Sequence, residues 1–252
     1  MFTQHTVTVV TAATGHPNLP RCIRSVQEQT YAHVDHLIVI DGLDRQAKVQ
    51  KILSELPPPP PTQRMMTLPQ PTGLDNWCGH RIYAAASFLI NTEFVCFLDE
   101  DNWFELEHLK SLIGAIRAAN AKWAFSLRRI VNEMGDFVTL DECENLGNLH
   151  PTFRSEKCFH VDVNCFMLRR VVAAMIAPAF YRPGGVPGQL EADTTICQIL
   201  LRQFPNPATN RQHTVNYLVG NRPNSVKASF FLRGNEIMRQ RYPDGMPWKT
   251  QS

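Results

Sequence analysis

Short apolar segments alternate with amphipathic segments through the first half of the chain, and this alternation restricts the fold more than any other feature of the sequence. Five apolar segments have the length and composition of buried strands: residues 6–12, 36–42, 64–68, 94–98 and 123–131. Four segments between them place apolar residues at helical spacing: residues 19–30, 46–56, 76–90 and 106–120. This order predicts a single α/β domain with a mostly parallel, doubly wound sheet and helices on both faces.

The second half of the chain is less regular, and we find no clean boundary between independent domains. Polar residues 134–153 predict an inserted loop or an edge hairpin, and residues 159–176 predict a strand that turns into a helix. A glycine-rich link at residues 184–188 leads into a helix over residues 190–204. The tail after Val219 is expected to form a flap or a packing arm.

Charge and cysteine content narrow the class of protein. A net charge of +2 is too balanced to indicate a nucleic-acid partner. The seven cysteines include no C-x-x-C pair, which favours reduced structural thiols over a disulfide frame or a zinc site. The chain has no signal-peptide pattern and no apolar run long enough to span a membrane. We therefore expect a cytoplasmic location, and peripheral contact with the inner face of the membrane is left open.

Three consecutive acids, Asp99, Glu100 and Asp101, follow directly on the apolar strand at residues 94–98. Adjacent carboxylates repel one another and are costly beside an apolar core unless a positive group lies among them. Asp99 and Asp101 project to the same side of an extended chain. Their hard oxygen ligands suit Mg²⁺ or Mn²⁺, which recruit substrate phosphates as further ligands. The alternative is that they cap the following helix, but one acid suffices for a cap, so we favour the metal.

A second acid, Asp41, ends the strand at residues 36–42 and precedes a glycine. Ligands of doubly wound sheets bind beyond the carboxyl ends of the strands, where Asp41 and the three acids are expected to meet. An Asp-Gly turn is the structural alternative for Asp41.

The opening of the chain resembles nucleotide-sugar-dependent glycosyltransferases of the GT-A fold, particularly the family-2-like group. The matching residues are Ser25, Val26, Gln29, Thr30, Tyr31 and Asp41, and the acids at 99–101 match the metal-binding Asp-x-Asp of that family. The resemblance covers about residues 6–102 well and residues 160–204 more loosely. It implies a GT-A-like domain in which residues 1–132 bind the nucleotide sugar and residues 133–252 bind the acceptor and supply a C-terminal flap.

The resemblance also assigns roles to individual residues. It implies that the nucleotide is contacted by Thr11, Ala12, Thr14, Asp41, Arg81, Asp99 and Glu100. It implies that Asp101 and Asp99 bind Mn²⁺ or Mg²⁺, and in some relatives a later histidine is a further ligand, a position that His213 matches. A surface arginine at 81 and a packing histidine at 213 remain the structural alternatives.

Family members commonly carry an acidic Glu-Asp pair at the start of a late helix, and one of its acids is the catalytic base. Here Asp193 matches the base, Ala192 replaces the usual glutamate, and Glu191 is a competitor for the role. A carboxylate within reach of the acceptor hydroxyl accepts its proton as the new bond forms. A helix cap is the alternative for both acids. The resemblance favours inversion, and the altered pair together with His213 leaves retention open.

These observations predict a metal-dependent glycosyltransferase that moves a sugar from a nucleoside-diphosphate sugar to a hydroxyl of a glycan, a lipid-linked molecule or a small molecule. A nucleotidyltransferase is the first alternative, although residues 11–21 lack its glycine-rich, basic phosphate loop. A non-catalytic module that binds nucleotide sugars is the second, because Ala192 alters the acidic pair. A dehydrogenase is disfavoured because no G-x-G-x-x-G follows the first strand.

Overall fold

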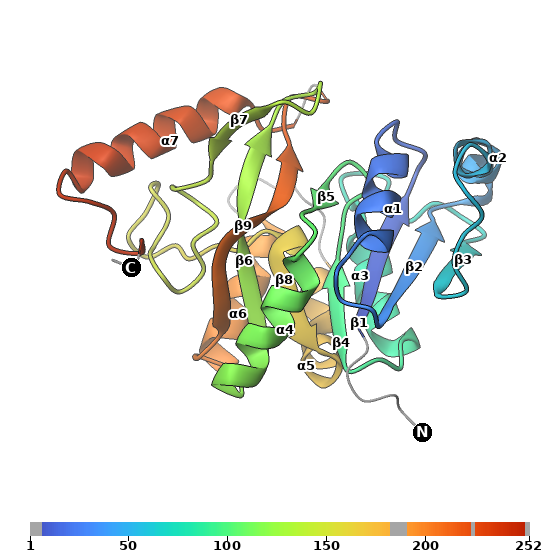
Figure 1. Cartoon of the computed structure of the whole chain (residues 1–252), viewed down its shortest axis with the longest axis horizontal. Coiled ribbons are helices and arrows are strands. Elements are labelled where there is room, and N and C mark those ends of the chain that lie inside the picture. The colour runs from blue at the N-terminus through green and yellow to red at the C-terminus, as the bar shows by residue number, and fades with distance from the viewer. Residues whose placement is uncertain (1–6, 182–190, 223–224, 250–252) are drawn as a thin grey trace.

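The structure is a computed structural model that describes residues 7–181, 191–222 and 225–249 (Figure 1). The predicted glycine-rich link at residues 184–188 lies outside the described residues. One sheet of nine strands forms the centre, in the order β3-β2-β1-β4-β8-β6-β9-β5, with β7 paired to β6.

The first half of the chain confirms the predicted alternation of strands and helices. Its elements are β1 (Val7–Ala13), α1 (Leu19–Gln27), β2 (Val34–Ile40), α2 (Leu43–Ser54), β3 (Gln63–Thr67), α3 (His80–Leu89) and β4 (Phe94–Phe97). β1 runs parallel to β2 and β4, and β2 runs parallel to β3. Helix α3 begins four residues later than expected, because Asp75, Asn76 and Cys78 have positive φ angles of 54°, 64° and 49° and interrupt a right-handed helix.

The part of the chain after β4 confirms the helix predicted at residues 106–120 and the strand predicted at 123–131, and it adds antiparallel strands that the apolar pattern did not predict in detail. Its elements are β5 (Trp103–Phe104), α4 (His108–Ala119), β6 (Trp123–Val131), β7 (Phe137–Leu140), η1 (Val163–Cys165), β8 (Phe166–Arg169), α5 (Arg170–Ile176), η2 (Ala177–Phe180), α6 (Ala192–Gln203), β9 (Ala208–Leu218) and α7 (Ala228–Arg241). β8 lies between β4 and β6 and is antiparallel to both. β7 pairs antiparallel with β6, which confirms the edge hairpin, and β9 runs parallel to β6.

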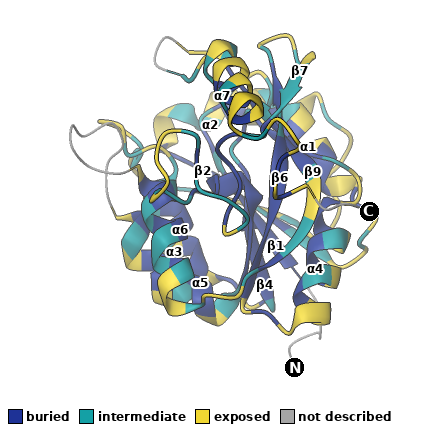
Figure 2. Cartoon of the chain, turned by 90° about the vertical axis from the view of Figure 1, so that its left-hand side faces the viewer, coloured by how far each residue is buried: buried dark blue, intermediate teal, exposed yellow. Residues whose placement is uncertain are grey.

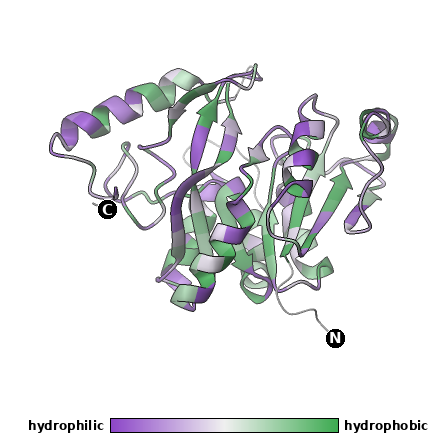
Figure 3. Ribbon diagram, viewed as in Figure 1, coloured by the Kyte–Doolittle hydropathy of each residue, from purple (hydrophilic) through white to green (hydrophobic). Residues whose placement is uncertain are grey.

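Helices cover both faces of the sheet, as predicted. Figure 2 shows α3, α5 and α6 on one side of the strands and α1 and α4 on the other. The largest fully buried side chains include Phe94, Phe97, Trp123, Phe125 and Phe166, all from β4, β6 and β8. Figure 3 shows apolar residues gathered in the central strands, whereas α7 alternates hydrophilic and hydrophobic residues along its length. Within the described residues, no helix has the length and apolar composition needed to cross a bilayer.

The parallel strands β1, β2 and β4 direct their carboxyl ends to the same edge of the sheet. The loops that follow these strands carry Thr14, Asp41 and the acids 99–101, so the fold brings the predicted donor-side residues to one edge. Strands β5 and β6 precede residue 132 in the chain but lie beyond β8 in the sheet, so strands from residues 1–132 and from residues 133–252 alternate at this side of the sheet.

Candidate active site

Glu100, the middle acid, is clasped by the loop that follows β1. Its carboxylate accepts the backbone N–H groups of Thr14 (2.9 Å), Gly15 (2.9 Å) and His16 (2.8 Å), and also the Thr14 hydroxyl. Only 5% of Glu100 is exposed. Both carboxylate oxygens are engaged in holding residues 14–16 beside the acids, and the direct nucleotide contact predicted for Glu100 stays a prediction.

We expect Glu100→Gln to lower the free energy of unfolding by about 2 kcal/mol, because a neutral amide cannot accept from all four donors of the loop. The loop that it holds also belongs to the predicted nucleotide site, so the KM for the donor is expected to rise. Urea unfolding followed by steady-state kinetics measures both effects. Glu133→Gln, at an exposed acid, is the matched control. Equal free energies of unfolding for the Glu100→Gln and Glu133→Gln proteins would contradict a stabilising role of the hydrogen bonds between Glu100 and residues 14–16.

Asp99 is half-buried at the end of β4, and both of its carboxylate oxygens accept a hydrogen bond. The Tyr83 hydroxyl donates to Oδ1 (2.5 Å), and the Asn164 amide donates to Oδ2 (2.9 Å). Burial raises the pKa of Asp99, the neighbouring charge of Asp101 raises it further, and the two hydrogen bonds oppose the rise. A nearby cation would reverse this cost by favouring the ionised form.

Asp101 faces the loop that follows β9. Its Oδ2 accepts the Asn221 amide at 2.8 Å and lies 3.6 Å from the Arg222 guanidinium. Its side chain is 17% exposed, so it is accessible but not freely solvated. The late segment of the chain that meets the predicted metal acid is therefore the one at Asn221 and Arg222.

The structure does not place His213 beside Asp99 and Asp101. It lies on β9 opposite Leu127, and its charged neighbours are Asp141, Glu142 and Lys249. The same strand passes the acids only at Leu218, whose N–H donates to Asn102. Five residues of extended chain separate His213 from that point, which is about 16 Å. The predicted ligand role of His213 is therefore corrected.

Asp41 is 2% exposed and fixes the loop after β3. Its carboxylate accepts the N–H (2.6 Å) and hydroxyl (2.8 Å) of Thr72 and the N–H of Gly73 (2.9 Å). Asp41 thus fixes the position of the loop at Thr72 and Gly73 beside the strand ends. Its predicted contact with the nucleotide stays a prediction.

The residues predicted along β1 divide into two groups. Thr11 is fully buried inside the strand, and its hydroxyl lies 3.0 Å from His36 Nε2, so its predicted contact with the nucleotide is corrected. Ala12 and Thr14 are half-buried at the carboxyl end of β1, on the side of the acids. Their contact with a nucleotide stays a prediction.

Arg81 lies in the first turn of α3 and stacks on aromatic rings. Its guanidinium carbon is 3.7 Å from the centre of the Trp77 ring and 5.5 Å from that of Tyr181. Within the part of the chain that the structure describes, its buried Nε has no hydrogen-bond partner. Arg81 and Thr72 also line a cavity of about 190 Å³ whose other walls are mostly apolar, so Arg81 lies next to the loop that Asp41 holds.

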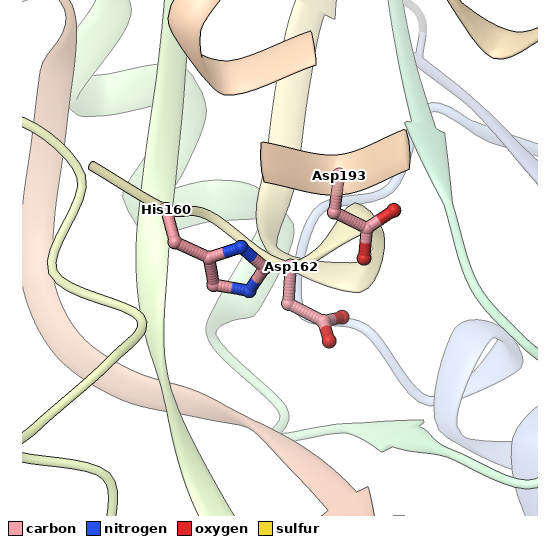
Figure 4. A group of neighbouring side chains, drawn as sticks. All are labelled: His160, Asp162 and Asp193. Atoms are coloured by element: carbon pink, nitrogen blue, oxygen red, sulfur yellow. The ribbon is translucent and has the colours of Figure 1, made fainter. Parts of the chain in front are cut away.

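Asp193 lies in the first turn of α6, facing Asp162 and His160 (Figure 4). One ligand atom from each of these three side chains lies within 4.8 Å of the others. Burial raises the pKa of Asp193 well above its usual range, and the charges of Asp162 and Asp99 add to the rise. Glu191 is exposed at the N-terminus of the same helix. The structure thus places Asp193, rather than Glu191, among the buried acids.

Arg128 supplies the positive charge behind these acids. It is 2% exposed, and its guanidinium donates to Asp141 (2.8 Å) and Asp162 (2.5 Å) and lies 3.5 Å from Glu144. The guanidinium also stacks 4.4 Å from the centre of the Tyr217 ring. Because Asp162 already has this partner, we assign no cation to the group of His160, Asp162 and Asp193.

The fold thus brings the acids that follow the parallel strands β2 and β4 to one edge of the sheet, and it places the half-buried Asp193 of a late helix beside Asp162. The model of glycosyl transferase family 2 matches residues 7–175. This is more than half of the chain, which therefore belongs to glycosyl transferase family 2. Among curated proteins, no sequence matches the chain.

Solved structures confirm the GT-A-like fold. One is S. aureus TarS 1–349 in complex with UDP-GlcNAc, with a TM-score of 0.61 and 12% identity over 94% of this chain and 65% of that one. Another is the same protein in complex with UDP, with a TM-score of 0.58 and 13% identity over 85% and 61%. The chain thus spans less than two thirds of either TarS structure. At such identities the likeness concerns the fold alone.

Proposed function

We propose that this family 2 enzyme transfers a sugar from a nucleoside-diphosphate sugar to an acceptor hydroxyl, with a divalent cation and with inversion. The observation that carries the proposal is that Asp99 and Asp101, after β4, lie near the half-buried Asp193 of α6, to which Asp99 is linked through residues 162–164. Family membership supports a glycosyltransferase, and the UDP-GlcNAc and UDP complexes of TarS support a nucleotide-sugar donor.

The donor set of the proposed metal site fits Mn²⁺ or Mg²⁺. Asp101 offers a partly exposed carboxylate that pairs with the Arg222 guanidinium, so the position already accommodates a positive charge. Asp99 carries an elevated pKa that a cation would lower. Asp101 and Asp99 would hold the ion through oxygen ligands. When bound, it would stabilise the negative charge on the departing nucleoside diphosphate.

The chain's own residues have separable roles in the proposed reaction. Ala12, Thr14 and Asp41 line the nucleotide side, and the Arg81 guanidinium approaches the phosphates. Asp193 accepts the proton of the acceptor hydroxyl as the new glycosidic bond forms. Residues 1–132 then supply most of the donor site, and residues 133–252 supply the base and the acceptor side. The acceptor is a hydroxyl of a glycan, a lipid-linked molecule or a small molecule, and no nucleic acid takes part.

A cytoplasmic location, with peripheral contact at the inner face of the membrane, is part of the proposal. All seven cysteines are free, and five of them are buried. Unpaired thiols are typical of reducing compartments, which supports this location.

The proposal is tested by measuring release of nucleoside diphosphate from a panel of UDP and GDP sugars, beginning with UDP-GlcNAc, in the presence of Mn²⁺. Water serves as the first acceptor, and candidate glycans follow. We expect turnover that falls by at least about 100-fold when EDTA removes the cation. Pyrophosphate release from a nucleoside triphosphate would instead identify a nucleotidyltransferase. Binding of the sugar nucleotide without turnover would identify a non-catalytic module.

A further inference from the structure

The turn at residues 162–164 contacts acids on both sides of the proposed site. It opens the 3-10 helix η1, and Asp162 closes the turn by accepting the backbone N–H of Asn164 at 3.0 Å. Asp162 is 4% exposed, Val163 is 5% exposed and Asn164 is fully buried. A buried polar turn between two acids has to be held by specific hydrogen bonds, so its contacts are informative.

On the metal side, every polar atom of the Asn164 side chain has a partner. Oδ1 accepts the backbone N–H of Asp99 at 2.6 Å. Nδ2 donates to Asp99 Oδ2 at 2.9 Å and to Asp162 Oδ1 at 2.7 Å. The amide orientation is unambiguous, because a backbone N–H only donates and the carboxylates only accept. Asn164 therefore fixes both the backbone and the carboxylate of Asp99.

On the base side, the adjacent residue holds Asp193. The backbone N–H of Val163 donates to Asp193 Oδ2 at 3.2 Å. Consecutive Cα atoms are about 3.8 Å apart, so one peptide unit joins the group that holds Asp99 to the group that holds Asp193. A shift of this turn would displace both acids together.

The turn itself is anchored from behind. Arg128 donates to Asp162 Oδ2 at 2.5 Å, and Asn145 Oδ1 accepts the Asp162 N–H at 2.7 Å. Arg128 is held in turn by Asp141 at 2.8 Å. These buried partners fix the turn against the centre of the sheet, so the position of Asn164 is set by the fold and not by the ligand.

We propose that Asn164 is a positioning residue for glycosyl transfer. It sets the orientation of Asp99 toward the cation, and through its turn it fixes the position of Asp99 relative to Asp193. The inference rests on the proposed function, in which Asp99 binds the cation and Asp193 accepts the proton. Mutation of a group that orients a metal ligand typically lowers metal affinity or activity by 10- to 100-fold.

The test measures binding of Mn²⁺ in the presence of UDP or GDP by titration calorimetry, in the wild type, Asn164→Leu and Asn164→Ser. Leu keeps much of the volume and removes all the hydrogen bonds, whereas Ser retains one short donor. We expect Mn²⁺ affinity to fall by about tenfold or more in Asn164→Leu and by a smaller factor in Asn164→Ser. If Asn164→Leu does not fold, Asn164→Ser decides the outcome.

Asn235→Leu is the matched control, because Asn235 is an equally buried amide whose side chain hydrogen-bonds to Thr139, Leu140 and the Glu142 N–H, away from the turn and from Asp99. We expect it to lower the Tm but to leave Mn²⁺ affinity within about twofold. Equal losses of affinity in Asn235→Leu and the Asn164 variants would overturn the inference, as would wild-type affinity in a folded Asn164 variant. A wild type that binds no Mn²⁺ with either nucleotide would overturn the cation-dependent proposal and this inference together.

Discussion

Asp101→Asn is expected to lower kcat/KM by about 10³-fold, because the variant removes the most accessible carboxylate of the proposed metal site. The free energy of unfolding of the Asp101→Asn protein should change little or rise. The substitution removes a like charge beside Asp99, and the pair that it breaks with Arg222 involves a half-exposed guanidinium, which contributes little. Activity assays over a range of Mn²⁺ concentrations, together with thermal unfolding, measure both effects.

Asp244→Asn is the matched control for this charge removal, because Asp244 is an exposed aspartate on the loop after α7. It should retain full activity. A fully active Asp101→Asn protein with unaltered Mn²⁺ dependence would show that the carboxylate does not bind the cation. A variant that loses activity only because it unfolds would be recognised by its Tm.

Asp193→Asn is expected to reduce kcat by about 10³-fold, within the range for loss of a general base. The amide keeps the shape of the side chain and can still accept the Val163 N–H, but it cannot take a proton from the acceptor. Glu191→Gln, at the exposed start of the same helix, should retain most of the activity. The reverse ranking of these two variants would assign the base to Glu191.

The pH dependence of kcat/KM gives a second test of Asp193. A base acts in its ionised form, so activity rises with pH through its pKa. Burial and the charges of Asp162 and Asp99 raise the pKa of Asp193, so the acidic limb should lie above the ordinary aspartate value of about 3.9. Asp162→Asn removes one of those charges and should move the limb to lower pH. An acidic limb at the ordinary value would contradict the assignment.

The strand ends and their acids were predictable because they depend on local pattern. An apolar run that stops at Asp99 places that acid at the edge of a sheet, whatever the rest of the chain does. Asp41 follows the same logic, and parallel pairing of β1 with β2 and β4 then brings the two strand ends to one edge. The first turn of α6 was likewise predictable, because acids precede apolar residues at helical spacing in the sequence.

The contacts that organise these acids were not predictable in the same way. Asn164, Arg128 and Glu100 take their roles from partners 65, 34 and 86 residues away in the chain. No local periodicity identifies such partners. The one signal available was chemical: a buried strand context around Asn164 leaves an amide that must find hydrogen bonds. His213 illustrates the opposite error, since the resemblance matched it to a metal-binding histidine of some relatives and strand β9 carries it elsewhere.

The insertion of β8 between β4 and β6 has a consequence for the order of assembly. Strands β3, β2, β1 and β4 pair among themselves once residue 97 has been made, whereas β6 and its other partners β7 and β9 join these four strands through β8, whose last residue is Arg169. Such non-local pairings form slowly and leave strand edges open meanwhile. Asn164 lies just before β8. We therefore expect Asp99 to gain its amide partner only as the sheet closes, which makes the site one of the last parts of the protein to become ordered.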